Sequence, residues 1–198
     1  MRLTKNLFIL SAFIFCLPTI SVSAEEGATA QMLSDTCAGC HGTDGASGGP
    51  ATPSIAGLSE EYFIEVMQGY KSGDVPSTIM GRLAKGYEDK DFEKMAGYFS
   101  QLSFPSSEQE FDADLAKKGA KLHDKYCDKC HAEGGSSADD DSGILASQWK
   151  PFLQWTLMDY TSGERQMIKK MKKKVDQLLE KEGEKGTQAL LEFYASQK

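Results

Sequence analysis

Two copies of one five-residue motif constrain this chain more than any other feature of its sequence. Cys37 to His41 reads Cys-Ala-Gly-Cys-His, and Cys127 to His131 reads Cys-Asp-Lys-Cys-His, at an offset of 127 − 37 = 90 residues. The same offset pairs residues beyond the motifs, among them Ala56 with Ala146, Met67 with Leu157, Tyr70 with Tyr160, and Ser72-Gly73 with Ser162-Gly163. A register shared over this length predicts two similar domains of about 80 to 90 residues.

Each residue of the motif has a separate chemical role in a c-type haem site. The two thiols add to the vinyl groups of a porphyrin, and two intervening residues put the sulfurs about one helical turn apart. The imidazole that follows at once then meets the iron. The sequence therefore predicts two covalently bound haem c groups, attached through Cys37, Cys40, Cys127 and Cys130 and ligated by His41 and His131.

Three other uses of the cysteines explain less. A thioredoxin-like redox motif needs a sheet-based fold with a strand before it, and no strand pattern precedes either motif. A zinc site of four cysteines, or a pair of disulfides, leaves the two histidines without a role. Haem accounts for all six residues.

A sixth iron ligand is expected from later in each half. Only His123 remains once the two motif histidines are used, so histidine cannot complete both sites. Methionine is the natural candidate, because its soft thioether raises the reduction potential of a haem iron. Met80 lies in a loop between two predicted helices, whereas Met67 and Met95 lie on apolar helix faces. We expect Met80 to ligate the first haem.

In the second half the choice lies between Met171 and Met167. The offset of 90 from Met80 falls on Lys170, so Met171 misses this position by one residue and Met167 by three. We expect Met171 to be the ligand, with Met167 as the alternative.

The N-terminus is typical of a secretory signal peptide over residues 1–24. Basic Arg2 and Lys5 precede an uncharged run from Leu7 to Ile20, and small residues end the segment at Ala24. The run is shorter than the about 20 residues of a membrane span. We expect cleavage after Ala24, a periplasmic location and no membrane span.

The two domains are predicted over residues 25–103 and 108–198, with the joint near Pro105, a helix breaker. We expect an all-α fold, with helices over 62–70, 91–101, 111–125 and 188–196 where apolar residues recur at helical spacing. Gly119 falls on the apolar side of the third of these helices, where it would let another helix approach closely.

Net charge argues against nucleic acid as a partner. The chain without residues 1–24 has 22 − 2 = 20 Lys and Arg against 29 Asp and Glu, a net charge of −9 before any cofactor. Phosphate backbones favour a basic footprint. An acidic chain is compatible with docking to a basic protein surface.

Several other residues have a less definite role. We expect His123 to lie on the surface or in packing, and Trp149 and Trp155 to pack on haem or across the domain interface. The Pro50 carbonyl either orients the His41 ring or belongs to a plain turn. The lysine-rich segment 169–174 is most simply a solvated face, and it would also guide an acidic partner.

Four stretches resemble one family in particular, the dihaem cytochrome subunit of flavocytochrome c sulfide dehydrogenase. They are residues 37–42, 77–82, 92–99 and 121–127, and the likeness runs over essentially the whole chain after residue 24. The resemblance implies two class I cytochrome c domains related by a pseudo-twofold axis, with His41 and Met80, and His131 and Met171, as axial ligands.

The resemblance also implies an FAD-binding partner subunit that oxidises sulfide to sulfur. Electrons would pass from flavin to one haem, then to the other, and then to a small soluble cytochrome c. No nucleophile or general-base constellation appears outside the haem motifs, so we expect no catalysis by this chain alone. The alternatives are a free-standing dihaem shuttle to a terminal oxidase and a dihaem peroxidase, which needs an open iron.

Overall fold

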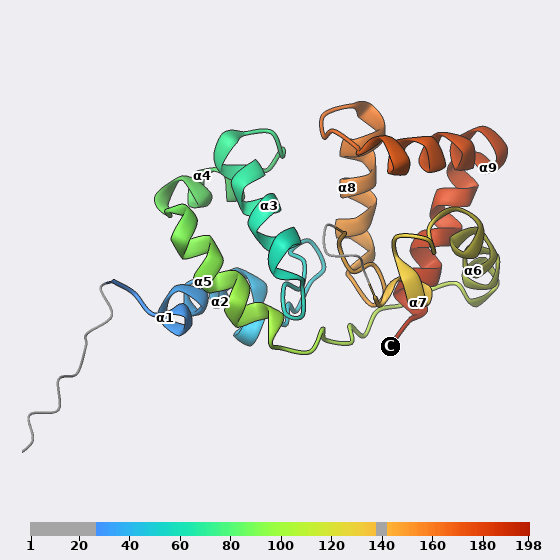
Figure 1. Cartoon of the computed structure of the whole chain (residues 1–198). Coiled ribbons are helices and arrows are strands. Elements are labelled where there is room, and N and C mark those ends of the chain that lie inside the picture. Colours follow the sequence, from blue (N-terminus) through green and yellow to red (C-terminus); the bar gives the residue numbers. More distant parts are fainter. Residues whose placement is uncertain (1–26, 138–141) are drawn as a thin grey trace, which may run out of the picture.

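The computed structural model describes residues 27–137 and 142–198 as two helical halves lying side by side (Figure 1). The predicted signal peptide lies outside the described residues. The first half contains α1 (Ala30–Asp35), α2 (Ala38–His41), η1 (Thr43–Gly45), α3 (Glu60–Ser72), α4 (Met80–Leu83), η2 (Ala84–Gly86) and α5 (Asp89–Ser100). The second contains α6 (Ala113–Tyr126), α7 (Ala132–Gly135), α8 (Lys150–Ser162) and α9 (Lys169–Ser196). The described residues contain no β-strand, so the all-α prediction is confirmed.

The four predicted helices are present as α3, α5, α6 and the end of α9. The last begins well before the predicted residue 188 and bends at Gly183, where φ is 58°. Of the described helices that were not predicted, α1 and α8 are the longest. α1 is only six residues long, and α8 buries Leu153 alone, so neither shows a strong apolar stripe.

The backbone follows the predicted register of 90 residues. The amides of Ile55 and Ala56 donate to the Gly45 carbonyl, and those of Leu145 and Ala146 donate to the Gly135 carbonyl. α3 and α8 both end in a left-handed glycine, Gly73 with φ 93° and Gly163 with φ 86°. The repeat in the sequence is therefore a repeat in the fold.

Each half has its own apolar cluster. In the first half α5 supplies Phe92, Met95 and Phe99, all at most 1% exposed. In the second half the cluster is built mainly from α6 and α9, with Leu122, Leu178 and Leu190. The two clusters are separate, as expected for two domains.

Close packing of α6 on α9 depends on Gly119. A Cβ atom at this position would overlap the Ala189 carbonyl oxygen and crowd the Phe193 side chain. The close helix approach expected at Gly119 is confirmed.

A buried amide joins the two halves. The Ser54 amide donates to Gln148 Oε1 (3.0 Å), and Gln148 Nε2 donates back to the Ser54 carbonyl (3.0 Å). Next to it, the Trp149 indole donates to the Ser47 carbonyl (3.1 Å). Gln148 is 3% exposed, so this pairing lies in the interior of the interface. Buried, fully satisfied hydrogen bonds of this kind fix relative orientation.

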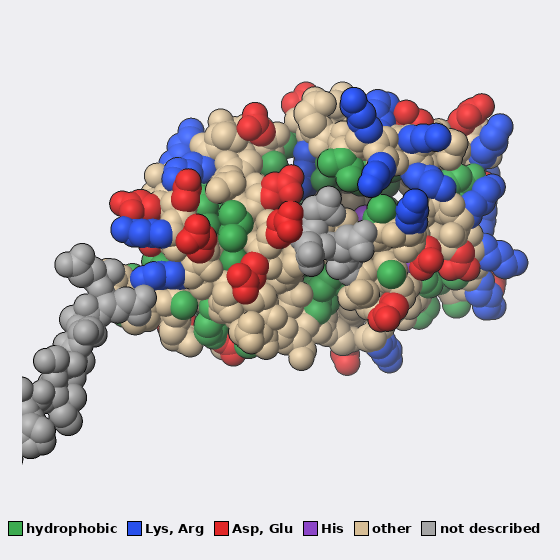
Figure 2. All heavy atoms as spheres, in the orientation of Figure 1, with side chains coloured by type: hydrophobic (Ala, Val, Ile, Leu, Met, Phe, Trp, Pro, Cys, Tyr) green, Lys and Arg blue, Asp and Glu red, His purple; other side chains and the backbone are tan. Residues whose placement is uncertain are grey.

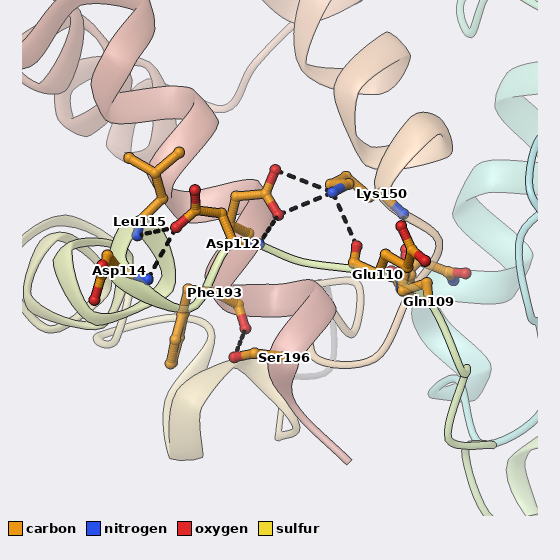
Figure 3. A network of polar contacts seen from close by, with 10 residues as sticks. Gln109, Glu110, Asp112, Asp114, Leu115, Lys150, Phe193 and Ser196 are labelled. Atoms are coloured by element: carbon orange, nitrogen blue, oxygen red, sulfur yellow. Dashed lines mark hydrogen bonds and ion pairs between the residues drawn. The ribbon is translucent and has the colours of Figure 1, made fainter.

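The linker between the halves is held by an ion pair (Figure 3). Lys150 Nζ contacts both carboxylate oxygens of Glu192 (3.0 and 2.9 Å) and donates to the Glu110 carbonyl (3.0 Å). The Asp112 amide donates to the same carboxylate (3.0 Å). The network ties the start of α6 to α8 and to the last turns of α9.

Gly119→Ala is expected to destabilise the second half by about 1–3 kcal/mol, because a methyl group there overpacks the α6–α9 contact. Thermal unfolding of the haem-loaded protein measures this change. Gly97→Ala is the matched control, because a Cβ at Gly97 in α5 meets no atom within 4 Å. That change should stabilise by about 0.5–1 kcal/mol through helix propensity. Equal effects of the two substitutions would contradict the packing role of Gly119.

Candidate haem sites

The two motif histidines are oriented in the same way. His41 Nδ1 donates to the Pro53 carbonyl at 2.8 Å, and His131 Nδ1 donates to the Gly143 carbonyl at 2.9 Å. A carbonyl oxygen only accepts, so Nδ1 carries the proton and Nε2 keeps its lone pair. An imidazole held by a second hydrogen bond is prepared to ligate a metal through its other nitrogen.

Each carbonyl lies twelve residues after its histidine (53 − 41 and 143 − 131). The suggestion that the Pro50 carbonyl orients His41 is therefore wrong. The chain turns at Gly49, where φ is 62°, and the carbonyl that reaches His41 is that of Pro53, four residues later.

The first cysteine of each motif lies one turn before the histidine. The His41 amide donates to the Cys37 carbonyl (2.9 Å), and the His131 amide to the Cys127 carbonyl (3.0 Å). Burial raises the pKa of the Cys37 and Cys127 thiols. No disulfide joins the four described cysteines, and Cys40 is exposed. Within residues 27–137 and 142–198, no three Cys, His, Asp or Glu side chains gather as a metal site.

One cavity connects the two motifs. It has a volume of about 1190 Å³ and is lined by Cys37, His41 and Met80 from the first half and by Cys127, Cys130, His131 and Met171 from the second. A pocket for one small ligand typically measures about 300–1,000 Å³. The space is larger than one such ligand needs, and its lining is mostly apolar, as two porphyrins require.

The two expected methionine ligands stand at similar points in the chain. Met80 directly follows Ile79, the N-cap of α4, and Met171 lies in the first turn of α9 after its N-cap, Ile168. Both line the cavity, and Met167 is not among its lining residues. Met67 also lines it but belongs to the first apolar cluster.

The residues present fit a haem in each half. Cys37 in the first half, Cys127 and Cys130 in the second, and in each half an imidazole with free Nε2 and a thioether all border the same apolar space, while Cys40 lies exposed beside it. Such a set would offer covalent attachment and two protein ligands to each iron, and a haem held in this way would supply electron-transfer chemistry.

The two halves differ in the side chains that pack next to the Cys-x-x-Cys-His motifs. His123 is fully buried, its Nδ1 lies 3.0 Å from the Tyr194 hydroxyl, and its ring packs on Phe193. The equivalent position in the first half is Leu33, and Phe99 replaces Tyr194 in the matching backbone contact. His123 is thus a packing residue, which was one of the two roles expected for it. With Tyr194 it forms a buried polar pair that the first half lacks.

The tryptophans have different environments. Trp149 lies across the interface, with its ring against Gly49, as expected. Trp155 is 50% exposed and is not among the residues that line the cavity, so its packing on haem or across the interface stays a prediction. The lysines at the start of α9 form a largely exposed face, where Lys172 pairs with Asp176 at 2.8 Å. Figure 2 shows blue side chains gathered over this part of the molecule.

Comparison with known proteins agrees with this geometry. A family model for cytochrome c matches residues 24–103. Cytochrome c4 of Stutzerimonas stutzeri is 33% identical over 148 residues, which cover 65% of this chain and 69% of that protein. The chain belongs to the cytochrome c family. The crystal structure of reduced recombinant cytochrome c4 from Pseudomonas stutzeri matches this cytochrome with a TM-score of 0.70 at 26% identity, over 87% of this chain and all of that one.

The cytochrome subunit of sulfide dehydrogenase from Chlorobaculum tepidum is 48% identical over 73 residues, or 37% of this chain. The match spans 66% of that relative, slightly less than two thirds of its length. Together the comparisons and the fold establish two class I cytochrome c domains and two covalently bound haem c groups. No helix within the described ranges is long and apolar enough to cross a membrane.

Sequence reasoning missed the residues that act through the backbone or across the interface. The Pro53 and Gly143 carbonyls are backbone atoms and carry no side-chain signal, and the two residues differ in type although they stand 90 residues apart. Gln148 and Arg165 have no counterpart of the same type 90 residues earlier, where Leu58 and Val75 stand. The repeat therefore provides no sequence signal for a role of Gln148 or Arg165.

Replacing His123 by Leu is expected to make the cytochrome less sensitive to acid. Burial lowers the pKa of His123, with Asp128 and Asp124 opposing this effect. Below about pH 6.5, His123 binds a proton in the unfolded chain more readily than in the folded chain. His123 therefore lowers the free energy of unfolding as the pH falls below this value. The loss of melting temperature between about pH 7.5 and 5.5 should shrink in His123→Leu. An unchanged loss would show that the buried imidazole takes up its proton freely.

Proposed function

We propose that this cytochrome is the electron-transfer subunit of a sulfide-oxidising flavoenzyme. It accepts electrons from an FAD-binding sulfide dehydrogenase subunit and passes them to a small soluble cytochrome c. The observation that carries the proposal is the 48% identity to the Chlorobaculum cytochrome subunit, which exceeds the 33% identity to cytochrome c4. The chain itself supplies no sulfide-binding chemistry in this proposal.

The residue roles in this proposal are supported by the cavity, which all of the residues concerned except Cys40 line. Cys37 and Cys40, and Cys127 and Cys130, form the thioether bonds. His41 and Met80 ligate the first iron, and His131 and Met171 ligate the second. Haem c, when bound, supplies one-electron redox chemistry. The Pro53 and Gly143 carbonyls hold the two imidazoles, and the apolar lining limits access of water to both sites.

We place the domains at residues 25–103 and 108–198, after a signal peptide removed at Ala24, and the mature protein in the periplasm. The first boundary is supported by the family match, which ends at residue 103. The repeat supports the second. Export provides the compartment in which c-type haem is attached and small electron carriers are met.

A free-standing dihaem shuttle is the second candidate, and one observation favours it. Cytochrome c4 matches the fold over nearly the whole chain, including all of the solved protein. In that case the electrons reach the chain from a membrane or soluble donor without any flavin partner.

Purification of the exported protein from its own host separates these two functions. We expect it to isolate with a flavoprotein and to be reduced by sulfide only when that partner is present. Thiosulfate is the control donor and should not reduce it. A purified red protein with no flavin absorbance and no flavin-dependent reduction by sulfide would support the shuttle.

Replacement of the methionines tests the ligand assignment. The oxidised protein should show the weak long-wavelength absorption band of an iron–sulfur bond at both haems. Met171→Leu should remove about half of this band and lower the potential of one haem, as expected on loss of a thioether ligand. Met167→Leu is the matched control and should leave the band intact. The reverse pattern would assign Met167 as the ligand.

A further inference from the structure

Arg165 lines the shared cavity at the boundary between its two halves, among the phenol rings of tyrosines from both halves. Its guanidinium lies 4.7 Å from the centre of the Tyr160 ring in α8, and Tyr62 of α3 lies close enough to act on it electrostatically. Tyr70, two turns further along α3, also acts electrostatically on it. All four residues line the shared cavity.

This cation has no carboxylate partner among the described residues. No Asp or Glu oxygen there comes within 4 Å of the Arg165 guanidinium, although Glu65 and Asp159 lie near enough to influence the tyrosines. Burial raises the pKa of Tyr160 to about 12 and also raises that of Tyr70, so these phenols stay neutral near pH 7. A partly buried charge facing an apolar space is costly unless an anion meets it.

The haems bring the missing anion. Every haem c carries two propionate carboxylates, and the planar guanidinium is the side chain best suited to bind a carboxylate. The other cations that line the cavity are less suited. Lys129, Lys170 and Lys173 are exposed, and Lys174 donates to the Lys125 carbonyl at 3.2 Å.

The arginine belongs to one half only. The Arg165 amide donates to the Asp159 carbonyl (2.9 Å), and the Val75 amide makes the equivalent bond to Gly69 (3.1 Å). The first half thus has valine where the second has arginine. Tyr62 also crosses the boundary, since a Cβ at Gly143 would lie 2.8 Å from its hydroxyl oxygen. The carbonyl of that same Gly143 holds the second imidazole.

We propose that Arg165 is the counter-charge for a haem propionate where the two crevices meet, held in place by Tyr62 and Tyr160. The inference rests on the two haems of the family and not on the identity of the electron donor. A fixed cation near one haem stabilises the added electron there. An otherwise near-symmetric pair of sites thereby gains two different potentials, which gives electron flow a direction.

The test is a spectroelectrochemical titration of the purified haem-loaded protein between about pH 5 and 8. Arg165→Gln should lower the midpoint potential of one haem at pH 8. The ratio of reduced to oxidised haem at a fixed potential should fall on the order of tenfold, the effect of a unit charge about 10 Å away at an effective dielectric constant of about 20. Toward pH 5 the potential should recover, because a carboxylate without its cation has a raised pKa and becomes protonated.

Two further variants make the test specific. Tyr62→Phe keeps the charge and should cause a smaller shift, and Lys185→Gln, which removes an exposed charge from α9, should cause none. If Arg165→Gln fails to load both haems, Arg165→Met replaces it with the same expected result. An unchanged potential, or a fall of equal size at every pH, overturns the proposal, since neither is compatible with a paired carboxylate.

Discussion

Each half of this cytochrome is built around an apolar space that its own side chains leave open, and the rest of the structure depends on a haem filling it. A domain of about 80 to 90 residues buries a limited core of its own. Here α5 supplies much of the first apolar cluster, and α6 with α9 most of the second, but both halves border the same cavity of about 1190 Å³. A bound cofactor therefore contributes to stability as well as to redox chemistry.

The junction between the halves matters for the same reason. Gln148 pairs with the backbone of Ser54, the residue after Pro53, and Trp149 donates to the Ser47 carbonyl, so the loop that carries the Pro53 carbonyl is held by the other half. Tyr62 lies in turn against Gly143, whose carbonyl holds His131. Each imidazole is thus oriented by a loop that the opposite half helps to position. The same contacts therefore orient the two imidazoles and hold the two halves together.

Much of this architecture could be predicted from the sequence, because each motif residue has a distinct chemical role and the repeat of 90 residues transfers information between the halves. The haem attachment, the helical fold and the close approach at Gly119 follow from such signals. Other features could not be predicted. The carbonyls that orient the histidines are backbone atoms. The sequence does not distinguish an exposed tryptophan such as Trp155 from a buried one. A role for Arg165 can be recognised only when α3 and α8 are seen to border the same cavity. Met171, the ligand proposed for the second haem, departs from the repeat by one residue, and only the cavity lining distinguishes it from Met167.

The most direct measurement of the central claim is the number of c-type haems per chain, from a pyridine haemochrome assay against the protein concentration. The account predicts two haems per chain that stay attached after denaturation, one for each motif. The double variant Cys127→Ser and Cys130→Ser should retain one haem, the one attached to the first half, with its ligands unchanged. A single haem in the unaltered protein, or haem that is released on denaturation, would contradict the account.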